Sequence, residues 1–534
     1  MIASSLTSRS DGSEPPRTQA AFACLTFLAS LALTGLYDLV AGGTYDYDEF
    51  VYLLLGHGVS SGRLPYRDFL FYHPPGILMV MGFLQPLIHQ WWAWGRVLSL
   101  LLSAGTCALV YLTSRRFLPR TTSLIAALLF ACDPILLVSG TRILPDVYVM
   151  FFTFLGIYLL LVASGQSDGG QRNQGDLDGR LKSSSAPNGT VPSNVSSWDL
   201  PSAARSLLQL REPDGTVAWR LWMLSVAAGV CFGIGVWFKY PAALAVPAAL
   251  LLARRRSLAF LAAMAVTALI LFAPFVSTLH HLYDDTVVYQ QSRFTYPLGI
   301  RLGSILLFAV LLQPLAVFGA AIRPVRWWLL AGYAAAILYL GSSQVYYHYM
   351  LPIVPYAAIL GAIFIASLSK ENIARLLPPV AAGSIGVTLL WAAMMQFTPG
   401  NYPFHITSAQ TASVAPVSAY IDRHVPPGSQ IFDDQPDLPV LAYRANCDNY
   451  FWSDSTVATH SQIQFCLLHA RYVIHFFAHG SGFPPGFLYR AYDASGIPPG
   501  SVDDKYRRTQ AGSGQSGAFV YDTHRHMPYL PPRN

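Results

Sequence analysis

Long apolar runs constrain this chain more than any other feature of its sequence. They are roughly 17 to 25 residues long, the length that a helix needs to cross the hydrocarbon core of a bilayer. Only 12% of the side chains are charged and 53% are hydrophobic, whereas an average soluble domain has about 25% charged residues. Because continuous apolar runs lack the alternation of a membrane β-barrel, we predict a polytopic α-helical membrane protein with about eleven transmembrane helices. The predicted spans are 22–41, 95–113, 121–140, 147–164, 220–238, 241–253, 258–276, 301–321, 327–341, 350–367 and 376–396.

Basic residues between the predicted spans orient the chain. They occur at 115–120, 254–256, 323–326 and 370–375, and all four groups fall on one side when the spans are counted. The positive-inside rule makes that side cytoplasmic, which predicts a plasma (inner) membrane protein with a cytoplasmic N-terminus. The apolar run 77–89 would break this alternation if it crossed the membrane, so we interpret it as a short juxtamembrane helix. The net charge of +6 comes largely from arginines at the ends of spans, where they mark orientation. We therefore expect no nucleic-acid partner.

This orientation divides the chain into four parts. Residues 1–21 form a cytoplasmic N-terminal tail, and 22–396 form the transmembrane domain, with a first external loop at 42–94. Residues 165–218 are rich in Ser, Gly, Asn, Asp and Pro, a composition too polar to bury a core, and are predicted to be a disordered cytoplasmic insertion. Residues 397–534 have mixed, turn-rich patterning that predicts a small extracytoplasmic α/β domain.

The predicted C-terminal domain contains two short apolar strands and a candidate disulfide. The strands are expected at 430–432 and 472–476, where apolar residues gather between turn-forming ones. Cys447 and Cys466 lie in the same segment and are candidates for a disulfide if it faces an oxidising compartment.

An acidic cluster follows the first predicted span, at residues 45–49. Carboxylates at the end of a membrane span are expensive enough to be functional candidates. Partial shielding from water raises the pKa of a carboxyl group, which suits a base acting on a hydroxyl. The alternative is that Asp48 or Glu49 only caps a helix beginning near Phe50. Which of Asp46, Asp48 and Glu49 acts as the base stays open.

Further charged residues on the external side complete the groups that sugar transfer requires. Transfer from a phosphate-activated donor needs a base for the acceptor proton and cations for the departing phosphate, which leaves already ionised and needs no general acid. Asp146 is the candidate acid of the second external loop, and Arg142, Lys239 and Arg293 are candidate phosphate ligands. Their alternatives are a helix cap for Asp146, an interfacial lysine at Lys239 and a solvated loop charge at Arg293.

The sequence indicates no certain cofactor. A divalent metal ion is a candidate, with Asp48, Asp146 and His73 as the residues that would bind it. His348 and the pair at 280–281 show no recognisable ligand spacing, so we interpret them as structural.

Several segments together resemble the GT-C glycosyltransferases, above all the protein O-mannosyltransferase-like and aminoarabinose-transferase-like branch. The similarity begins in the first external loop and covers about residues 22–365. The C-terminal domain matches only in type. The segments that carry it are 48–52, 62–69, 73–76, Arg96, 142–146 with 151–152, 233–239 and 348–355.

The resemblance implies a membrane glycosyltransferase. It would move a sugar, mannose-like or another hexose or pentose, from a polyprenyl-phosphate-linked donor to an extracytoplasmic hydroxyl of a protein, lipid or glycan, by base-assisted direct displacement. By position, Asp48 would be the base or orient the acceptor, Asp146 would steer the acceptor or hold a divalent ion, and Lys239 would meet the donor phosphate. The alternative is a non-catalytic lipid or polysaccharide transporter or flippase, which predicts ionisable groups deep in the spans and related halves. The predicted spans are nearly free of such groups, and the sequence shows no internal repeat.

Overall fold

The computed structural model describes most of the predicted transmembrane domain and four strands beyond it. Several predictions lie outside the described residues: most of the insertion at 165–218, the last span at 376–396, Asp46, Arg293, Cys447 and Cys466. The described residues are 16–40, 47–69, 71–88, 90, 93–164, 215–288, 297–307, 313–322, 326–340, 347–368, 423, 426, 429, 431–433, 472–478, 507–511 and 516–522.

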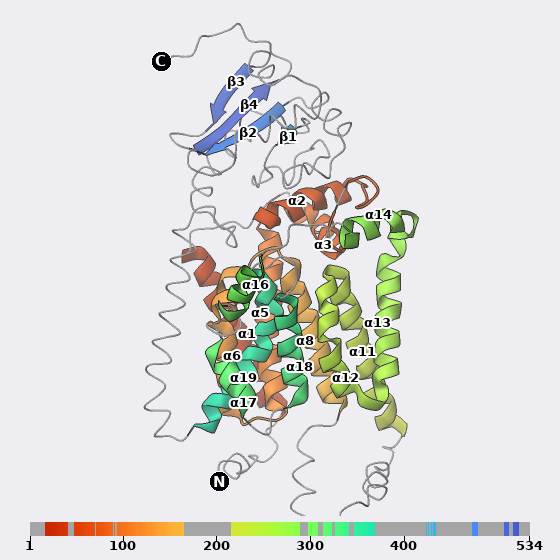
Figure 1. Ribbon diagram of the computed structural model, residues 1–534, viewed down its shortest axis with the longest axis vertical. Helices are drawn as coiled ribbons and strands as arrows, with labels where there is room; N and C mark the ends of the chain where they lie inside the picture. The colour runs from red at the N-terminus through yellow and green to blue at the C-terminus, as the bar shows by residue number, and fades with distance from the viewer. Residues whose placement is uncertain are drawn as a thin grey trace, which may run out of the picture.

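A bundle of helices forms the body of the protein (Figure 1). Six stretches of the described chain are long and apolar enough to cross a membrane, which confirms the prediction of a polytopic helical fold; the count of eleven spans stays a prediction. These stretches are Pro16–Leu39, Trp94–Arg115, Pro145–Ala163, Trp219–Phe238, Tyr240–Val288 and His348–Ser367. The helices of the bundle are α1 (Pro16–Val40), α5 (Trp94–Arg115), α6 (Arg120–Ala131), α7 (Pro134–Ser139), α8 (Pro145–Ala163), α11 (Gly215–Phe238), α12 (Val246–Ala253), α13 (Ser257–Phe272), α16 (Leu298–Ile305), α17 (Pro314–Ala321), α18 (Trp327–Leu340) and α19 (Val354–Ser367), with short helices η2 (Tyr240–Ala245), η3 (Arg254–Arg256), η4 (Ala273–Thr278) and η7 (Tyr347–Ile353) between them.

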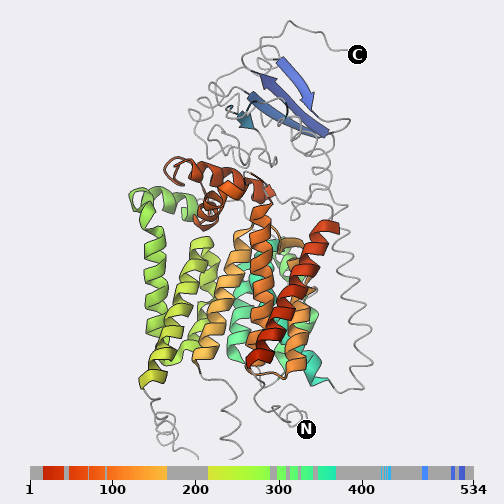
Figure 2. The same ribbon diagram turned by 180° about the vertical axis from the view of Figure 1, so that it is seen from behind.

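Small residues bring the helices of the bundle close together. Gly229 and Gly233, one turn apart on α11, face α13, and a Cβ atom at Gly233 would lie 2.7 Å from the Cβ of Thr267. Such small residues allow two helix backbones to approach each other in a membrane. Helix α13 exposes Leu258, which is 82% accessible, and other large apolar side chains on its outer side, as expected of a surface that faces lipid. Figure 2 shows α1 on the opposite side of the bundle from α13.

Three short helices cover one end of the bundle (Figure 1). They are α2 (Tyr47–Ser60), α3 (Gly76–Phe83) and α4 (Gln85–Ile88). At about 1.5 Å per residue, α3 and α4 are each far too short to cross a bilayer. That the run 77–89 is a juxtamembrane helix stays a prediction. Helix α2 packs on α3 through Gly56, where a Cβ atom would lie 2.6 Å from the Cβ of Met81.

A second short segment lies at the same end. It comprises α14 (Leu279–Tyr283) and the π-helix η5 (Asp284–Val288), which continue from the end of α13. Asp285 of η5 accepts a hydrogen bond from the backbone N–H of Phe71 at 3.4 Å, and the hydroxyls of Tyr240 and Thr286 lie 3.0 Å apart. The first contact fastens the α14 segment to the loop between α2 and α3, and the second fastens it to η2.

Four strands beyond the bundle form one sheet, on the side of α2 (Figure 1). The strands are β1 (Ile431–Asp433), β2 (Tyr472–Ala478), β3 (Arg507–Ala511) and β4 (Ser516–Asp522), in the order β1-β2-β4-β3. Strand β1 pairs parallel with β2, and β4 is antiparallel to both β2 and β3. The two strands predicted from the sequence are β1 and β2. The α/β character of the whole segment stays a prediction.

Candidate functional site

Charged side chains gather at the end of the bundle that α2 covers. Each comes from the end of a helix, where the chain leaves the apolar interior. Asp38 lies near the end of α1, Glu49 in the first turn of α2 and Arg96 in the first turn of α5, while Asp146 is in the first turn of α8 and Lys239 directly follows α11. Alternate helices run in opposite directions, so residues distant in sequence meet at this end.

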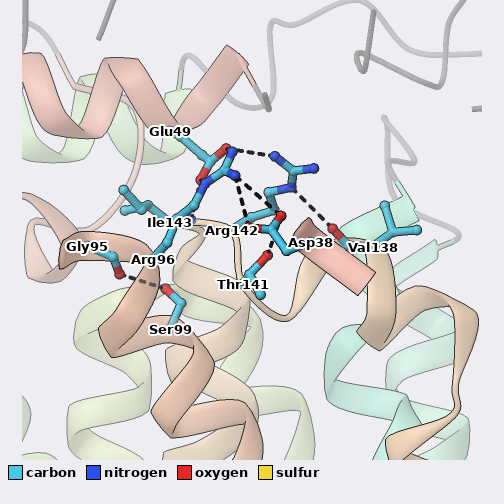
Figure 3. Close-up of polar contacts among 9 residues, drawn as sticks. All are labelled: Asp38, Glu49, Gly95, Arg96, Ser99, Val138, Thr141, Arg142 and Ile143. Atoms are coloured by element: carbon cyan, nitrogen blue, oxygen red, sulfur yellow. Dashed lines mark hydrogen bonds and ion pairs between the residues drawn. The ribbon is translucent and has the colours of Figure 1, made fainter. Parts of the chain in front are cut away.

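Glu49 lies at the centre of a buried ionic cluster (Figure 3). Its carboxylate accepts two hydrogen bonds from Arg96, at 2.8 Å from Nε and 2.6 Å from Nη2. Arg142 donates a third from Nη1 at 3.3 Å, and the backbone N–H of Ile143 donates a fourth at 3.0 Å. Because Glu49 has no exposed side-chain surface, its negative charge depends on these donors.

A second acid extends the same cluster to α1. Asp38 accepts hydrogen bonds from Nη1 of Arg96, at 3.3 Å to each oxygen, and from the hydroxyl of Thr141 at 3.2 Å. Asp38, Glu49, Arg96 and Arg142 therefore form a group of two anions and two cations, here called the Glu49 cluster. Such balance is what makes buried charges tolerable. The cluster joins α1, α2, α5 and the loop before α8.

Lys239 and Asp146 form a second buried ion pair. The Nζ of Lys239 donates to both carboxylate oxygens of Asp146 at 2.9 Å. Asp146 follows Pro145, a residue favoured at the first position of a helix, so its carboxylate lies at the positive end of α8. Lys239 has extended backbone between α11 and η2, with φ of −162° and ψ of 130°.

Two residues of η7 complete this second group. The ring of Tyr349 lies 3.9 Å from the Nζ of Lys239, and Nε2 of His348 lies 3.9 Å from an oxygen of Asp146. Lys239 and Asp146 are 4% and 1% exposed. Asp146, Lys239, His348 and Tyr349 are here called the Lys239 cluster.

Tyr52 and Asp48 lie one turn apart on α2. Tyr52 is 2% exposed and packs against the rings of Phe71 and His73. Burial raises the pKa of the Tyr52 hydroxyl well above its ordinary value, and the negative charges of Asp48 and Asp146 raise it further. Asp48 itself is half-buried, so it combines access to water with partial shielding.

The loop between α2 and α3 holds His73 by its backbone and ring. The hydroxyl of Tyr66 donates to the carbonyl of His73 at 2.5 Å, and the ring of Tyr72 lies 4.8 Å from the imidazole. In the part of the chain that the structure describes, no three His, Cys, Asp or Glu side chains are placed to hold a metal ion. The candidate ligands Asp48, Asp146 and His73 therefore do not form such a set.

The structure brings most of the predicted site residues to one end of the bundle. Asp48, Glu49, Arg142, Asp146 and Lys239 all lie there, although Arg142 is only 1% exposed and its guanidinium also donates to the carbonyl of residue 138. The roles of these residues stay predictions.

The sequence analysis assigned no role in the site to four members of the two clusters, Asp38, Arg96, His348 and Tyr349. Asp38 lies inside the predicted span 22–41, and its only signal is that it is an acid near the end of an apolar run. His348 was interpreted as structural because it has no metal-ligand spacing, but it lies beside Asp146.

Comparison with known families is consistent with this geometry. The sequence profile of a family described as dolichyl-phosphate-mannose-protein mannosyltransferase matches residues 86–175. The matched segment contains Arg96, Arg142 and Asp146, one or more from each cluster. No curated protein matches the chain by sequence.

Solved structures resemble nearly the whole chain. ArnT from Cupriavidus metallidurans bound to undecaprenyl phosphate has a TM-score of 0.57 at 14% identity, over 94% of this chain and 97% of ArnT. ArnT in the apo state gives a TM-score of 0.56 at 12% identity, over 96% and 98% of the two chains. The chain has the GT-C fold. A further GT-C protein, the Archaeoglobus fulgidus oligosaccharyltransferase in complex with zinc and sulfate, has a TM-score of 0.52 at 12% identity, over 94% of this chain and 73% of that one.

The GT-C fold confirms the resemblance found in the external loops.

Proposed function

We propose that this GT-C protein is a glycosyltransferase that moves a sugar from a polyprenyl-phosphate-linked donor to an acceptor hydroxyl. The observation that carries the proposal is the buried Asp146–Lys239 ion pair, at the end of the bundle that α2, the helix of Asp48, covers (Figure 1). A base for the acceptor and a cation for the phosphate then lie at one end of the bundle. The undecaprenyl phosphate of the similar ArnT structure supports a lipid-linked donor.

Asp48 is proposed as the base. It is half-buried and adjoins Glu49, which is fully buried and bonded to two arginines. A carboxylate that accepts several charged hydrogen bonds is a weak base, so Glu49 is better suited to hold the first turn of α2. Asp48, which precedes Glu49 in the same turn, can then face the acceptor hydroxyl.

Lys239 is proposed to bind the donor phosphate, and Asp146 to steer the acceptor. Lysine is a compact cation that suits a phosphate. Arg293 and Arg142 are the further proposed phosphate ligands. Arg142 could serve only if its bond to Glu49 were exchanged, because its guanidinium is buried in the Glu49 cluster.

In the proposed topology, the reaction takes place on the extracytoplasmic side of the inner membrane. Arg115 ends α5 and Arg120 begins α6, while residues 254–256 follow α12, and all lie at the end opposite α2 (Figure 1). The positive-inside rule supports a cytoplasmic location for that end. We propose eleven spans, with the predicted C-terminal domain on the external side beside α2.

The test is sugar transfer by the purified full-length protein in lipid. Asp48→Asn should lower the rate at least about 100-fold, the typical contribution of a general base, while undecaprenyl phosphate still binds. Asp284→Asn is the matched control, because Asp284 is an exposed acid of the α14 segment, and it should keep full activity. Full activity of Asp48→Asn would remove Asp48 as the base.

The sugar and the acceptor are to be identified in cells. The family description names mannose and a protein, so mannosyl transfer to protein hydroxyls is the first reaction to assay. Mass spectrometry of envelope glycans and glycoproteins from cells lacking the chain should show one sugar missing from one class of acceptor. Unchanged glycans and glycoproteins would contradict the proposed activity.

A further inference from the structure

A pair of hydroxyl groups joins the backbone next to Lys239 to the α14 segment. Lys239 is the single residue between α11 and η2, and its extended backbone turns the chain there. The hydroxyl of the next residue, Tyr240, lies 3.0 Å from that of Thr286 in η5. Because consecutive Cα atoms are about 3.8 Å apart, any displacement of Tyr240 changes the point from which the Lys239 side chain starts.

The direction of this hydrogen bond follows from a second contact of Thr286. Its Oγ1 atom lies 2.6 Å from the carbonyl oxygen of Leu282, which can only accept. A hydroxyl has a single hydrogen, so Thr286 donates to Leu282 and Tyr240 donates to Thr286. Thr286 is 4% exposed, which leaves water little access to either bond. The two hydroxyls therefore form one directed chain of hydrogen bonds from η2 to η5.

Further contacts make η5 a firm support for this chain of bonds. Asp285, next to Thr286, accepts from the backbone N–H of Phe71 at 3.4 Å. Tyr66, in the same loop as Phe71, packs edge-on against Phe275 of η4 with ring centroids 5.6 Å apart. In addition, η5 is a π-helix, a rare turn that is frequent at functional sites. The element that holds η2 is thus itself tied to the loop between α2 and α3.

We propose that Tyr240 and Thr286 are positioning residues, which keep the Lys239 ammonium where the donor phosphate binds. This inference rests on the proposed function, in which Lys239 binds that phosphate. Neither hydroxyl touches the donor in this proposal. Tyr240 acts through the backbone, and it does so whatever other groups contact the Lys239 side chain. Without the bond, η2 can shift, and a smaller share of the molecules has the ammonium in place.

The affinity of the full-length protein for undecaprenyl phosphate tests this role. Thr286→Val keeps the shape of the side chain but has no oxygen to accept from Tyr240. Binding should weaken about three- to tenfold, the range of one neutral hydrogen bond. Tyr240→Phe removes the same bond from the other side and should give the same loss, and the double variant should bind no more weakly than either single one. Thr286→Ser keeps a hydroxyl and should bind like the parent.

Thr278→Val is the matched control. Thr278 is buried at the end of η4, in the same part of the chain, and its hydroxyl donates to the carbonyl of Phe275 at 3.2 Å. This variant loses a similar hydrogen bond, but one that stays within η4 and does not reach η2. It should therefore bind undecaprenyl phosphate like the parent.

A Lys239→Ala background separates positioning of Lys239 from a merely structural role. With the ammonium gone, adding Thr286→Val should not weaken the remaining affinity further. Equal losses in both backgrounds, or unchanged affinity of folded Thr286→Val and Tyr240→Phe, would overturn the role of the two hydroxyls while leaving the proposed function intact. A parent protein that binds no undecaprenyl phosphate would instead overturn the proposed function, and this inference with it.

Discussion

Removing Arg96 should destabilise the protein far more than removing an exposed arginine. Arg96→Met takes two short hydrogen bonds from Glu49 and the guanidinium contact from Asp38. Glu49 then keeps Nη1 of Arg142 at 3.3 Å and the backbone N–H of Ile143 at 3.0 Å. The two carboxylates of the cluster then remain with one guanidinium, that of Arg142, whereas the parent protein has two.

The expected magnitude follows from the burial of this cluster. Breaking a buried ion pair by removing one partner costs about 3–5 kcal/mol, which corresponds to about two to four powers of ten in the unfolding equilibrium. Arg96→Lys keeps the charge but loses the two-pronged geometry, so its loss should be intermediate. Glu49→Gln combined with Arg96→Met should recover part of the stability, because the uncompensated carboxylate is gone.

Unfolding of the purified protein in detergent measures this difference. The matched control is Arg67→Met, since Arg67 also bonds an acid, Asp68, at 2.7 Å but is 51% exposed. Exposed ion pairs contribute little because solvent screens them, so this variant should unfold like the parent. Equal stability of Arg96→Met and Arg67→Met would refute the view that the Glu49 cluster holds α1, α2 and α5 together.

Three further outcomes are expected. Gly76→Ala should impair donor binding, because a Cβ atom there would lie 2.7 Å from the carbonyl oxygen of Trp237, two residues before Lys239; lipid-phosphate affinity measures this, and unchanged affinity would show that the backbone yields. Gly233→Leu should lower the thermal unfolding temperature by separating α11 from α13, and an unchanged temperature would contradict close packing there. Lys239→Ala should weaken the affinity for undecaprenyl phosphate about tenfold or more, and unchanged affinity would count against Lys239 as the phosphate ligand.

Hydrophobic length and charge alternation were enough to predict the class of fold. The run 77–89 is apolar enough to be taken for a span, but counting it would put the basic residues 115–120 outside. The structure divides it into α3 and α4. The positive-inside rule adds to hydropathy here, because it uses information from the far end of the next helix.

The partners within the site could not be predicted in the same way. Lys239 and Asp146 are 93 residues apart, as are Arg142 and Glu49. Counting spans indicates that these side chains reach the same end of the bundle. It does not indicate which cation meets which anion, because that depends on which helices are neighbours and how each is rotated. The phosphate role predicted for Arg142 ignores Glu49 for this reason.

The contacts of Asp38 have a consequence for biogenesis. A nascent chain exposes its N-terminal helix first. Asp38, near the end of that helix, accepts a hydrogen bond from the hydroxyl of Thr141, which lies 103 residues later. At about 5–20 residues per second, roughly 5 to 20 seconds of synthesis separate the two. The cation that binds Asp38, Arg96, also comes later, 58 residues along the chain. A chain interrupted in this interval would carry an acid at the end of its first helix without the guanidinium and hydroxyl that bind it in the folded protein.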